Sequence, residues 1–304
     1  MDTSRVYQKL KGYIDENRLI NNAPMKEHTS FKLGGSAKLL VLPKTKDELL
    51  YTLSLCRDYN VKRYVMGKGS NLIVKEKGYD GVIIKIGDYY NKISVQDETI
   101  TAQAGALMSS VAVKALQYAL SGIEFGSGIP GTVGGAVVMN AGAYGGEMSQ
   151  VTYKVKALDK FDTEVDISEK ELGFGYRNSI FNGRPYIVLE VYLKLIKGNQ
   201  KAIRDKMKEL SDKRNNKQPL NYPSAGSIFK RPQGNYAGKL IEEAGLKGLS
   251  IGGARVSPLH AGFIINEGSA TSQDVLDLIA IIQSTVQDKF DILLEPEVKI
   301  IGDE

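Results

Sequence analysis

The sequence predicts a soluble α+β protein, with two or three domains favoured over one large domain. Its 304 residues are more than one hydrophobic core usually organises. Hydrophobic residues make up 42% and charged residues 25%, which is ordinary for a globular protein. Short apolar strands alternate with amphipathic helices, and no apolar run has the length of a membrane span. Because the N-terminus lacks the apolar core of a signal peptide, we expect a cytoplasmic protein without membrane insertion.

Cysteine and histidine are scarce, which excludes several kinds of site. Cys56 is the single cysteine, so no internal disulfide and no cysteine-based metal cluster can form. His28 and His260 are the two histidines, and we expect no metal site. The net charge of +5 is mild, and the basic residues are scattered without interleaved aromatic residues. We therefore expect no nucleic-acid partner, whereas a ligand with several phosphates suits this charge.

The first third of the chain predicts a helix through Leu10 and Ile14, then an apolar strand over 37–42. Thr45 and Glu48 have the spacing of a capping box, which predicts a helix that buries Leu49, Leu50, Leu53 and Cys56. Cys56 at this spacing is interpreted as a core residue rather than a nucleophile. Two further strands are predicted over 61–66 and 72–74.

The pattern changes from Tyr89 on. A strand is predicted over 99–104 and a helix over 107–120, with one face formed by Leu107, Val111, Ala115 and Tyr118. Strands near 151–158 and 186–195 flank a second capping box, Ser168 to Glu171.

The segment Lys197-Gly198-Asn199 resembles a domain boundary, and the chain changes character after it. Ile203, Met207 and Leu210 line one face of a lysine-rich helix, whose charges are interpreted as a solvated face. A helix that begins at Leu240 ends at Gly245, and a longer helix is predicted over 272–290. The last segment, LEPEVKIIG, predicts a short buried strand.

The most unusual stretch is GSGIPGTVGGAVVMNAGAYGGE, over 126–147. Each glycine costs backbone entropy on folding, so we interpret the stretch as a loop and short helix that a ligand closely approaches. Pro130 suits the first turn of that helix, where N–H groups can bind an anion. The alternative is that the glycines serve tight turns between packed strands. Gly126, Gly128 and Gly131 spell GxGxxG, but the preceding segment is helical, so a Rossmann fold is rejected.

A second donor-rich loop is Gly67-Lys68-Gly69-Ser70-Asn71, between two predicted strands. Two glycines and small polar side chains can form a nest of N–H and hydroxyl donors for a phosphate or diphosphate. It is not a P-loop, because the GxxxxGK[ST] spacing is absent. A plain hairpin turn is the alternative.

Three polar residues lie among apolar neighbours: Arg177 in GFGYRNSIF, Ser227 in PSAGSIFK and Glu297 in LEPEVKII. A buried charge needs a partner or a function. Each also has a structural alternative, which is an ion pair for Arg177, a turn hydroxyl for Ser227 and an exposed strand position for Glu297. Serine hydrolysis is disfavoured because Ser227 does not lie in a GxSxG motif.

In this order, TSFKLGG, MGKGSNLIV, IPGTVGGAVVMNAGAYGGE, YRNSIF, PSAGSIFKRP, AGKLIEEAGLKG and LEPEVKIIG resemble the UDP-N-acetylenolpyruvoylglucosamine reductase (MurB) family. The matches run from about Thr29 to the C-terminus. The stretch between Arg177 and Ser227 is short, so the chain is similar to the shorter form of the family, without an added tyrosine-bearing loop.

The resemblance implies an FAD enzyme that uses NADPH to reduce the enolpyruvyl ether of a UDP-sugar to UDP-N-acetylmuramate in peptidoglycan synthesis. It implies an FAD-binding vanillyl-alcohol-oxidase-type (PCMH-like) two-part module and a C-terminal substrate domain. The expected domains are 1–88, 89–198 and 199–304. FAD is expected to be non-covalent, because neither glycine-rich loop holds a histidine. The sequence does not predict an oligomeric state.

The resemblance also assigns site residues. Arg177 and a protonated Glu297 would stabilise the enolate that forms on hydride addition, and Ser227 would deliver a proton to the carbanionic carbon. The expected FAD contacts are Gly67, Gly69, Ser70, Asn71, Gly128, Ile129, Pro130, Gly131, Gly134, Gly135, Asn140, Gly142 and Ala143. The expected substrate contacts are Tyr144, Tyr176 and Lys230.

Two other functions stay open at this point. A different FAD oxidase of the same fold would share the two loops but not the set of Arg177, Ser227 and Glu297. A non-enzymatic nucleotide or nucleic-acid binder would be colourless and would bind with a steep salt dependence.

Overall fold

The computed structural model describes residues 2–303 and divides into two compact units. Unit 1 consists of the residues up to Ile20, with Leu40–Lys68 and Val82–Arg214. Unit 2 consists of Asn21–Leu39, Gly69–Gly81 and the residues from Asn215 on. Two early segments thus belong with the C-terminal third, which the sequence did not lead us to expect. The three predicted domains, 1–88, 89–198 and 199–304, stay a prediction.

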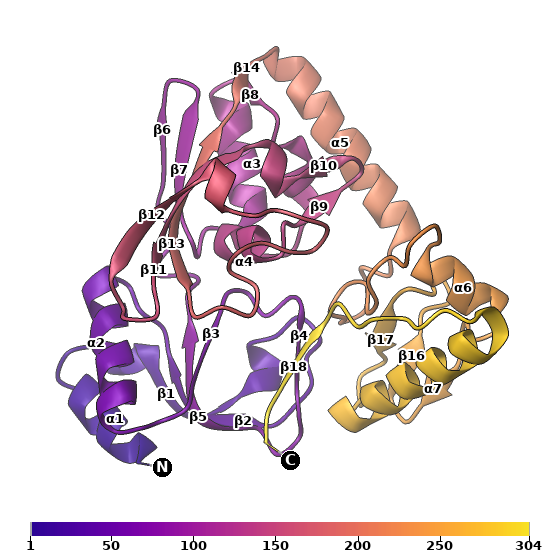
Figure 1. The fold of residues 1–304 in the computed structure, drawn as a ribbon, viewed down its shortest axis with the longest axis horizontal. Coiled ribbons are helices and arrows are strands. Elements are labelled where there is room, and N and C mark those ends of the chain that lie inside the picture. The colour runs from indigo at the N-terminus through magenta and orange to yellow at the C-terminus, as the bar shows by residue number, and fades with distance from the viewer. Residues whose placement is uncertain (1, 304) are drawn as a thin grey trace. The chain divides into compact units, whose positions relative to one another are not determined.

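The largest sheet of unit 1 has five antiparallel strands in the order β12-β11-β13-β7-β6 (Figure 1). Its strands are β6 (Ile93–Gln96), β7 (Thr99–Gln103), β11 (Thr152–Leu158), β12 (Glu164–Ser168) and β13 (Ile187–Lys194). Leu189, Val191 and Leu193 alternate as buried positions of β13. The helices α3 (Met108–Gln117) and α4 (Val133–Val138) pack on this sheet. Three of its strands were predicted within two residues of their observed ends.

The helix predicted over 107–120 is shorter than expected. Leu107 precedes it and pairs with Thr132 in an isolated bridge. Val111 and Ala115 are buried as predicted, but Tyr118 caps the C-terminal end and is 47% exposed. Its assignment to the buried face was therefore wrong, because the backbone leaves the helical conformation there.

A second sheet has the order β1-β2-β5-β3, and its strands β1, β2 and β5 contribute residues to both units. The strands are β1 (Leu19–Pro24), β2 (Ser36–Val41), β3 (Arg63–Met66) and β5 (Tyr79–Lys85), and β3 is parallel to β5. Within unit 1, α1 (Thr3–Leu10) packs against α2 (Lys46–Asp58).

Thr45 caps α2 by accepting from the N–H of Glu48, but Glu48 does not complete the predicted capping box. Its carboxylate pairs with Arg18 instead, with Oε1 2.7 Å from Nη2, because a buried carboxylate needs a charged partner. Leu49, Leu53 and Cys56 of α2 are buried as predicted, whereas Leu50 is half-buried.

The remaining elements of unit 1 are short. Two-residue strands pair as β8 (Leu120–Ser121) with β14 (Ile196–Lys197), and as β9 (Gly142–Ala143) with β10 (Gly146–Glu147). Residues 2–303 also contain the 3-10 helices η1 (Glu16–Arg18), η3 (Glu124–Gly128), η4 (Met148–Gln150) and η5 (Glu169–Glu171) of unit 1 and η2 (Met25–Glu27) of unit 2. The predicted capping box of Ser168 and Glu171 is confirmed at η5.

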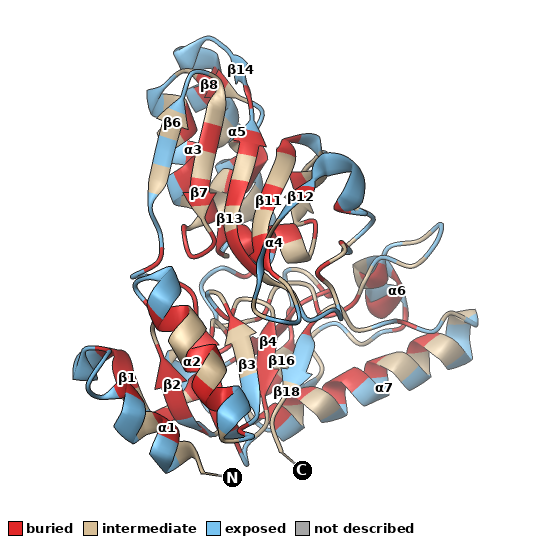
Figure 2. Cartoon of the chain, turned by 60° about the vertical axis from the view of Figure 1, so that its left-hand side comes forward, coloured by how far each residue is buried: buried red, intermediate tan, exposed pale blue. Residues whose placement is uncertain are grey.

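Unit 2 is built around α7 (Ser272–Phe290), whose buried side chains lie along one side (Figure 2). These side chains include Val275, Leu278, Ile279, Ile282 and Val286, as predicted. They pack with α6 (Ala237–Glu243) and with the sheet β15 (Ser250–Ile251), β16 (Ala254–Val256) and β17 (Ile264–Asn266). The long helix α5 (Gln200–Lys217) leads into this unit.

The C-terminal segment differs from its prediction as a buried strand. The strand β18 (Lys299–Ile301) pairs in parallel with β4 (Leu72–Val74), but its residues are exposed or half-buried. Glu297 precedes β18, and the buried residues of the segment are Leu294 and Val298. Among residues 2–303, no helix combines the length and apolarity needed to cross a membrane.

Candidate functional site

The loop of residues 67–71 presents a row of backbone donors. It joins β3 to β4, and none of its five N–H groups donates a hydrogen bond to another residue within 2–303. Gly69 has a φ of +72°, which favours glycine, and its carbonyl accepts from the N–H of Ser30 at 3.1 Å. Consecutive N–H groups without acceptors suit an anion. This loop therefore fits the phosphate-binding prediction better than the plain hairpin.

Asn71, at the end of this loop, holds the C-terminal segment of unit 2. Its side-chain amide donates to the backbone carbonyl of Glu297 at 3.1 Å. Its own carbonyl accepts from the N–H of Lys299 at the same distance. These two bonds fix Glu297 at the point where the chain enters β18.

Several glycines of the 126–147 stretch are needed because the chain packs closely on itself. A Cβ at Gly134 would lie 2.7 Å from the Cβ of Ala104, and one at Gly146 would lie 2.5 Å from the ring of Phe125. Across the two predicted loops, a Cβ at Gly67 would lie 2.2 Å from Oγ1 of Thr132. Tight packing thus accounts for much of the glycine density, and ligand contact stays a prediction for these residues.

The predicted short helix is present as α4, but it begins later than Pro130. Thr132 is the N-cap and accepts from the N–H of Gly135 at 3.4 Å. Val133 and Gly134 donate to the carbonyls of Ala106 and Ala104, so the start of α4 is fastened to the chain after β7. Pro130 therefore lies in the approach to the helix rather than in its first turn.

Arg214, on α5, is a cation that sequence reasoning missed. A Cβ at Gly128 would lie 2.5 Å from its Cδ, so the side chain covers the glycine-rich stretch. Burial lowers the pKa of Arg214, and the electrostatic effect of Tyr144 opposes that shift. The guanidinium makes no hydrogen bond or ion pair among residues 2–303. A partly buried cation without a carboxylate indicates an anionic ligand.

The spacing of residues in the sequence could have indicated that Arg214 lies on the buried side of its helix. It follows Ile203, Met207 and Leu210 at spacings of four, three and four residues, so it continues the apolar face of the helix. Treating all charges of this helix as a solvated face was therefore wrong for Arg214.

Arg177 projects from a tight turn in unit 1. Gly175 and Asn178 form an isolated bridge around it, and its φ of +51° is unusual for a side chain of this size. Its Nη2 donates to the carbonyl of Gly142 at 3.4 Å, and its guanidinium lies 5.1 Å from the ring of Tyr176. The turn thus holds Arg177 against the glycine-rich stretch.

The side chain of Asn140 is bonded to the turn that carries Arg177. It is 1% exposed, donates to the carbonyl of Gly175 at 3.0 Å and accepts from the N–H of Ser149 at 2.9 Å. Its side chain is therefore used within the chain rather than presented to a ligand. Tyr176 and Tyr144 are 52% and 43% exposed, so their rings are available to a substrate.

Ser227 and Glu297 are brought together within unit 2. The N–H of Glu297 donates to the carbonyl of Ile228 at 2.7 Å, and Phe229 pairs with Pro296 in an isolated bridge. On its other side, Ser227 pairs with Phe263. Ser227 and Glu297 are both half-buried, and Glu297 lies opposite Ile228, the residue after Ser227. Their joint catalytic role stays a prediction. Arg177 belongs to unit 1.

Lys230, three residues beyond Ser227, forms an ion pair with Glu295 at 2.8 Å. This bond lowers the pKa of Glu295. Lys230 remains partly exposed, so its predicted contact with a substrate phosphate stays a prediction.

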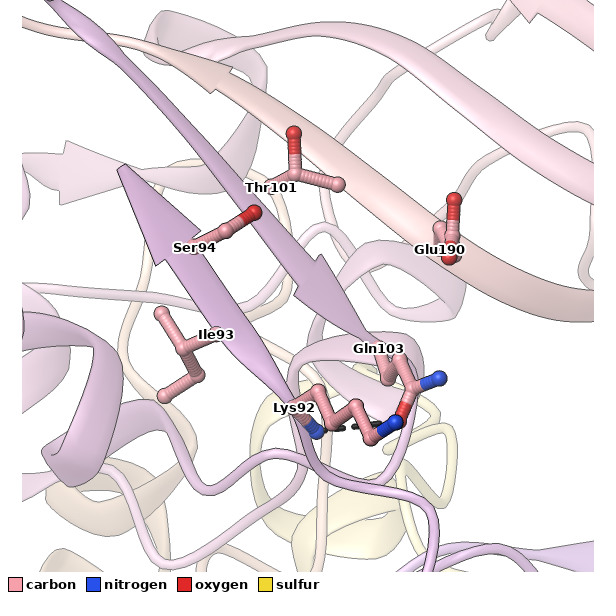
Figure 3. A pocket seen from close by; sticks show the side chains of 6 residues that line it. All are labelled: Lys92, Ile93, Ser94, Thr101, Gln103 and Glu190. Atoms are coloured by element: carbon pink, nitrogen blue, oxygen red, sulfur yellow. Dashed lines mark hydrogen bonds between the residues drawn. The ribbon is translucent and has the colours of Figure 1, made fainter. Parts of the chain in front are cut away.

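A shallow pocket elsewhere on unit 1 holds none of the predicted residues. Figure 3 shows its lining on β6, β7 and β13 and on the residue before β6: Lys92, Ile93, Ser94, Thr101, Gln103 and Glu190. The N–H of Lys92 is already bonded to the side chain of Gln103 at 2.9 Å. In the part of the chain that the structure describes, no group of three or more His, Cys, Asp or Glu side chains could hold a metal ion.

Two family models match the chain. One described as an FAD binding domain matches residues 37–161. One described as the C-terminal domain of UDP-N-acetylenolpyruvoylglucosamine reductase matches residues 218–301. The match to the FAD binding domain thus precedes the match to the reductase C-terminal domain along the chain.

Curated relatives match over nearly the full length. A UDP-N-acetylenolpyruvoylglucosamine reductase of Caldanaerobacter subterraneus subsp. tengcongensis is 52% identical over 97% of this chain and 97% of its own. The enzyme of the same name from Clostridium perfringens strain SM101 is 48% identical over 97% of each chain.

Among solved structures, UDP-N-acetylenolpyruvylglucosamine reductase (MurB) from Thermus caldophilus has a TM-score of 0.78 and 35% identity. The match covers 93% of this chain and 97% of that one. Alkyldihydroxyacetonephosphate synthase, at 17% identity and a TM-score of 0.50, covers 64% of this chain and 40% of its own and is similar in fold alone. The predicted fold class, an FAD-binding module of this type with a C-terminal domain, is confirmed.

Proposed function

Since the chain belongs to the UDP-N-acetylenolpyruvoylglucosamine reductase family, we propose that it reduces the enolpyruvyl ether of UDP-N-acetylglucosamine to UDP-N-acetylmuramate, with NADPH as the hydride donor. It is a flavin oxidoreductase of peptidoglycan synthesis. The use of NADPH, the non-covalent attachment of FAD and the cytoplasmic location are parts of the proposal.

The residues present fit FAD. The five N–H groups of residues 67–71 lack acceptors within 2–303 and suit a diphosphate. Arg214 supplies a cation beside Gly128 in the glycine-rich stretch. We propose that these two features hold the anionic parts of FAD. The predicted contacts around the ring are then Gly128, Ile129, Pro130, Gly131, Gly134, Gly135, Gly142 and Ala143, whereas the Asn140 side chain is used within the chain.

When bound and reduced by NADPH, FAD would supply the hydride that adds to the methylene carbon of the enolpyruvyl group. Negative charge then develops on the adjoining carbon and on the carboxylate of the substrate. Arg177 and a protonated Glu297 stabilise that charge by donating hydrogen bonds. Arg177 is held for this role by its strained turn and by its bond to Gly142.

Ser227 then donates its hydroxyl proton to the carbanionic carbon. A serine hydroxyl is a weak acid, but this carbon is a much stronger base, so the transfer is favourable. Tyr144, Tyr176 and Lys230 are proposed to contact the UDP-sugar, because they are exposed beside these residues in their own units.

The observation that carries the proposal is that the segment of Glu297 runs alongside the segment of Ser227: the N–H of Glu297 donates to the carbonyl of Ile228, the residue after Ser227, at 2.7 Å. A proton donor and an acid that stabilises an enolate have to reach the same three-carbon group. A different FAD oxidase would not need this pair.

The test is an anaerobic cycle of the purified protein. We expect NADPH to bleach a bound flavin and the enolpyruvyl UDP-sugar to restore its colour. A flavin that is reoxidised by oxygen but not by the enolpyruvyl sugar would indicate a different FAD oxidase. A colourless protein would indicate a non-enzymatic binder.

A further inference from the structure

Lys85, on β5, is a buried lysine whose presence the mechanism does not explain. It is 8% exposed, and its ammonium has no hydrogen bond or ion pair with any of residues 2–303. Burial lowers its pKa, the charge of Lys68 lowers it further, and Asp88 opposes the shift without reaching ion-pair distance. Lysine is almost never this buried without a partner, because desolvating its charge is costly.

Lys85 lies in unit 1 beside the end of β3, where the donor-rich loop of residues 67–71 begins. Lys85 pairs with Met66 in the parallel register of β5 and β3, and Ile86 N–H donates to the carbonyl of Met66. Met66 is the last residue of β3, so Gly67 and Lys68 follow directly. Lys85 therefore lies beside the start of the donor-rich loop.

Closely packed backbone at Gly87 and Gly105 also lies near the Lys85 side chain. A Cβ at Gly87 would lie 3.9 Å from Cε of Lys85, so the lysine stem runs beside Gly87. A Cβ at Gly105 would in turn lie 2.5 Å from the carbonyl oxygen of Gly87. The same segment after β7 carries the start of α4, and Thr132 of that start contacts Gly67. The Lys85 stem thus runs beside the backbone of Gly87, and the charges of Lys68 and Asp88 both act on its ammonium.

We propose that Lys85, together with Lys68, binds the diphosphate of FAD and neutralises its charge. The inference rests on the proposed flavin function and adds one cation, Lys85, that neither the glycine-rich loops nor the catalytic residues supply. The charge of Lys68 acts against that of the buried Lys85, and an anion between them would offset both the repulsion and the desolvation cost of Lys85. The acceptorless N–H groups of Gly67 and Lys68 complete the donor set.

The test compares the purified holoenzyme with Lys85→Met and Lys85→Arg. FAD release on dilution is followed by flavin fluorescence, and the freed chain is then titrated with FAD and with riboflavin, which lacks phosphates. We expect Lys85→Met to weaken FAD binding by about 10- to 100-fold, the range of a hydrogen bond to a charged group. Riboflavin affinity should be unchanged, and Lys85→Arg should recover part of the FAD affinity.

A stability measurement separates this role from a purely structural one. Without FAD, Lys85→Met should unfold at the same or a higher temperature than the wild type, because a buried unpaired charge has been removed. A lower unfolding temperature without FAD, together with equal losses for FAD and riboflavin, would overturn the proposal. Lys194→Met, an exposed lysine beside Glu98, is the matched control and should change none of these readouts.

The same variants also distinguish binding of the FAD diphosphate from binding of a phosphate of NADPH. If Lys85 serves a phosphate of NADPH instead, Lys85→Met keeps its FAD affinity and raises the KM for NADPH, and the proposal is wrong. If the wild type binds neither FAD nor riboflavin, the proposed function itself fails, which is a different outcome.

Discussion

The side-chain amide of Asn71 donates a hydrogen bond of 3.1 Å to the backbone carbonyl of Glu297, 226 positions later in the chain. The N–H of Lys299 donates back to the carbonyl of Asn71. A residue of the predicted diphosphate loop therefore also positions a predicted catalytic residue within unit 2. Cofactor binding and the placement of Glu297 are expected to depend on the same side chain.

Asn71→Ala should consequently affect two properties. Loss of this bond is expected to cost about 1 kcal/mol in anchoring the segment. We expect weaker FAD retention and slower reoxidation of the reduced enzyme by the enolpyruvyl sugar, measured separately by flavin fluorescence and stopped-flow absorbance. Asn91→Ala, which removes an exposed amide bond of 2.9 Å to Asp88, is the control. Normal reoxidation in Asn71→Ala would mean that this bond does not position Glu297.

Glu297 is predicted to act as a hydrogen-bond donor. A second negative charge beside the developing enolate would raise the barrier, so the protonated carboxyl is the useful form. Glu297→Gln keeps a donor and should retain measurably more activity than Glu297→Ala. Steady-state rates with saturating NADPH compare the two variants. Equal losses in both would contradict the donor role.

Gly67 is predicted to be essential for packing as well as for its N–H group. A methyl group there would meet Oγ1 of Thr132, so Gly67→Ala should lose about 1–3 kcal/mol of unfolding free energy. Thr132→Ala removes that oxygen, and the double variant should lose less than the sum of the two single variants. Gly12→Ala, where no atom lies within 4 Å, is the control. Additive losses in urea unfolding would show that the contact is not the cause.

The buried pair of Arg18 and Glu48 predicts the behaviour of the protein in acid. Burial alone raises the pKa of Glu48, but the bonds from Arg18 and from the N–H of Lys44 outweigh it and lower the pKa overall. A carboxylate with a lowered pKa stabilises the fold above its unfolded pKa of about 4.3, and this stability is lost as the pH falls through the folded value.

Glu48→Gln should therefore destabilise the protein by about 3 kcal/mol at neutral pH, because Arg18 is left without its charge partner. The difference from the wild type should shrink below about pH 4.3, where Glu48 begins to be protonated in the unfolded chain. Urea unfolding at several pH values measures it. Glu209→Gln, in an exposed cluster with Lys206 and Lys213, should change little at any pH. A difference between Glu48→Gln and the wild type that does not vary with pH would contradict this account.

Sequence patterns correctly predicted those helices and caps whose stabilising residues are close together in the chain. The helix Ser272–Phe290 was predicted to the residue, because a long apolar period follows a polar cap. The box of Ser168 and Glu171 needs only four consecutive residues. Thr45 and Glu48 have the same spacing, but Arg18, 30 positions earlier, takes the carboxylate of Glu48. A long-range ion pair of this kind leaves no trace in a local pattern.

The candidate site was predicted only in part, because local motifs identify some of its residues while others depend on long-range packing. The family motifs indicated Ser227 and Glu297, and the fold places Glu297 opposite Ile228, the residue after Ser227. Sequence alone could not tell whether the glycines face a ligand or another part of the chain, and several face the chain itself. Arg214 and Lys85 were missed because a cation without a partner is recognisable only when its surroundings are known.

The central claim is that Ser227 gives the proton that completes reduction of the enolpyruvyl group. In anaerobic stopped-flow absorbance, Ser227→Ala should be reduced by NADPH at close to the wild-type rate. Its reoxidation by the enolpyruvyl sugar should be slower by more than the roughly 10²–10⁴-fold that is typical of general acid–base groups. Ser227→Cys, with a more acidic group of similar size, should recover part of that rate. A Ser227→Ala enzyme that is reoxidised by the sugar at the wild-type rate would contradict the account.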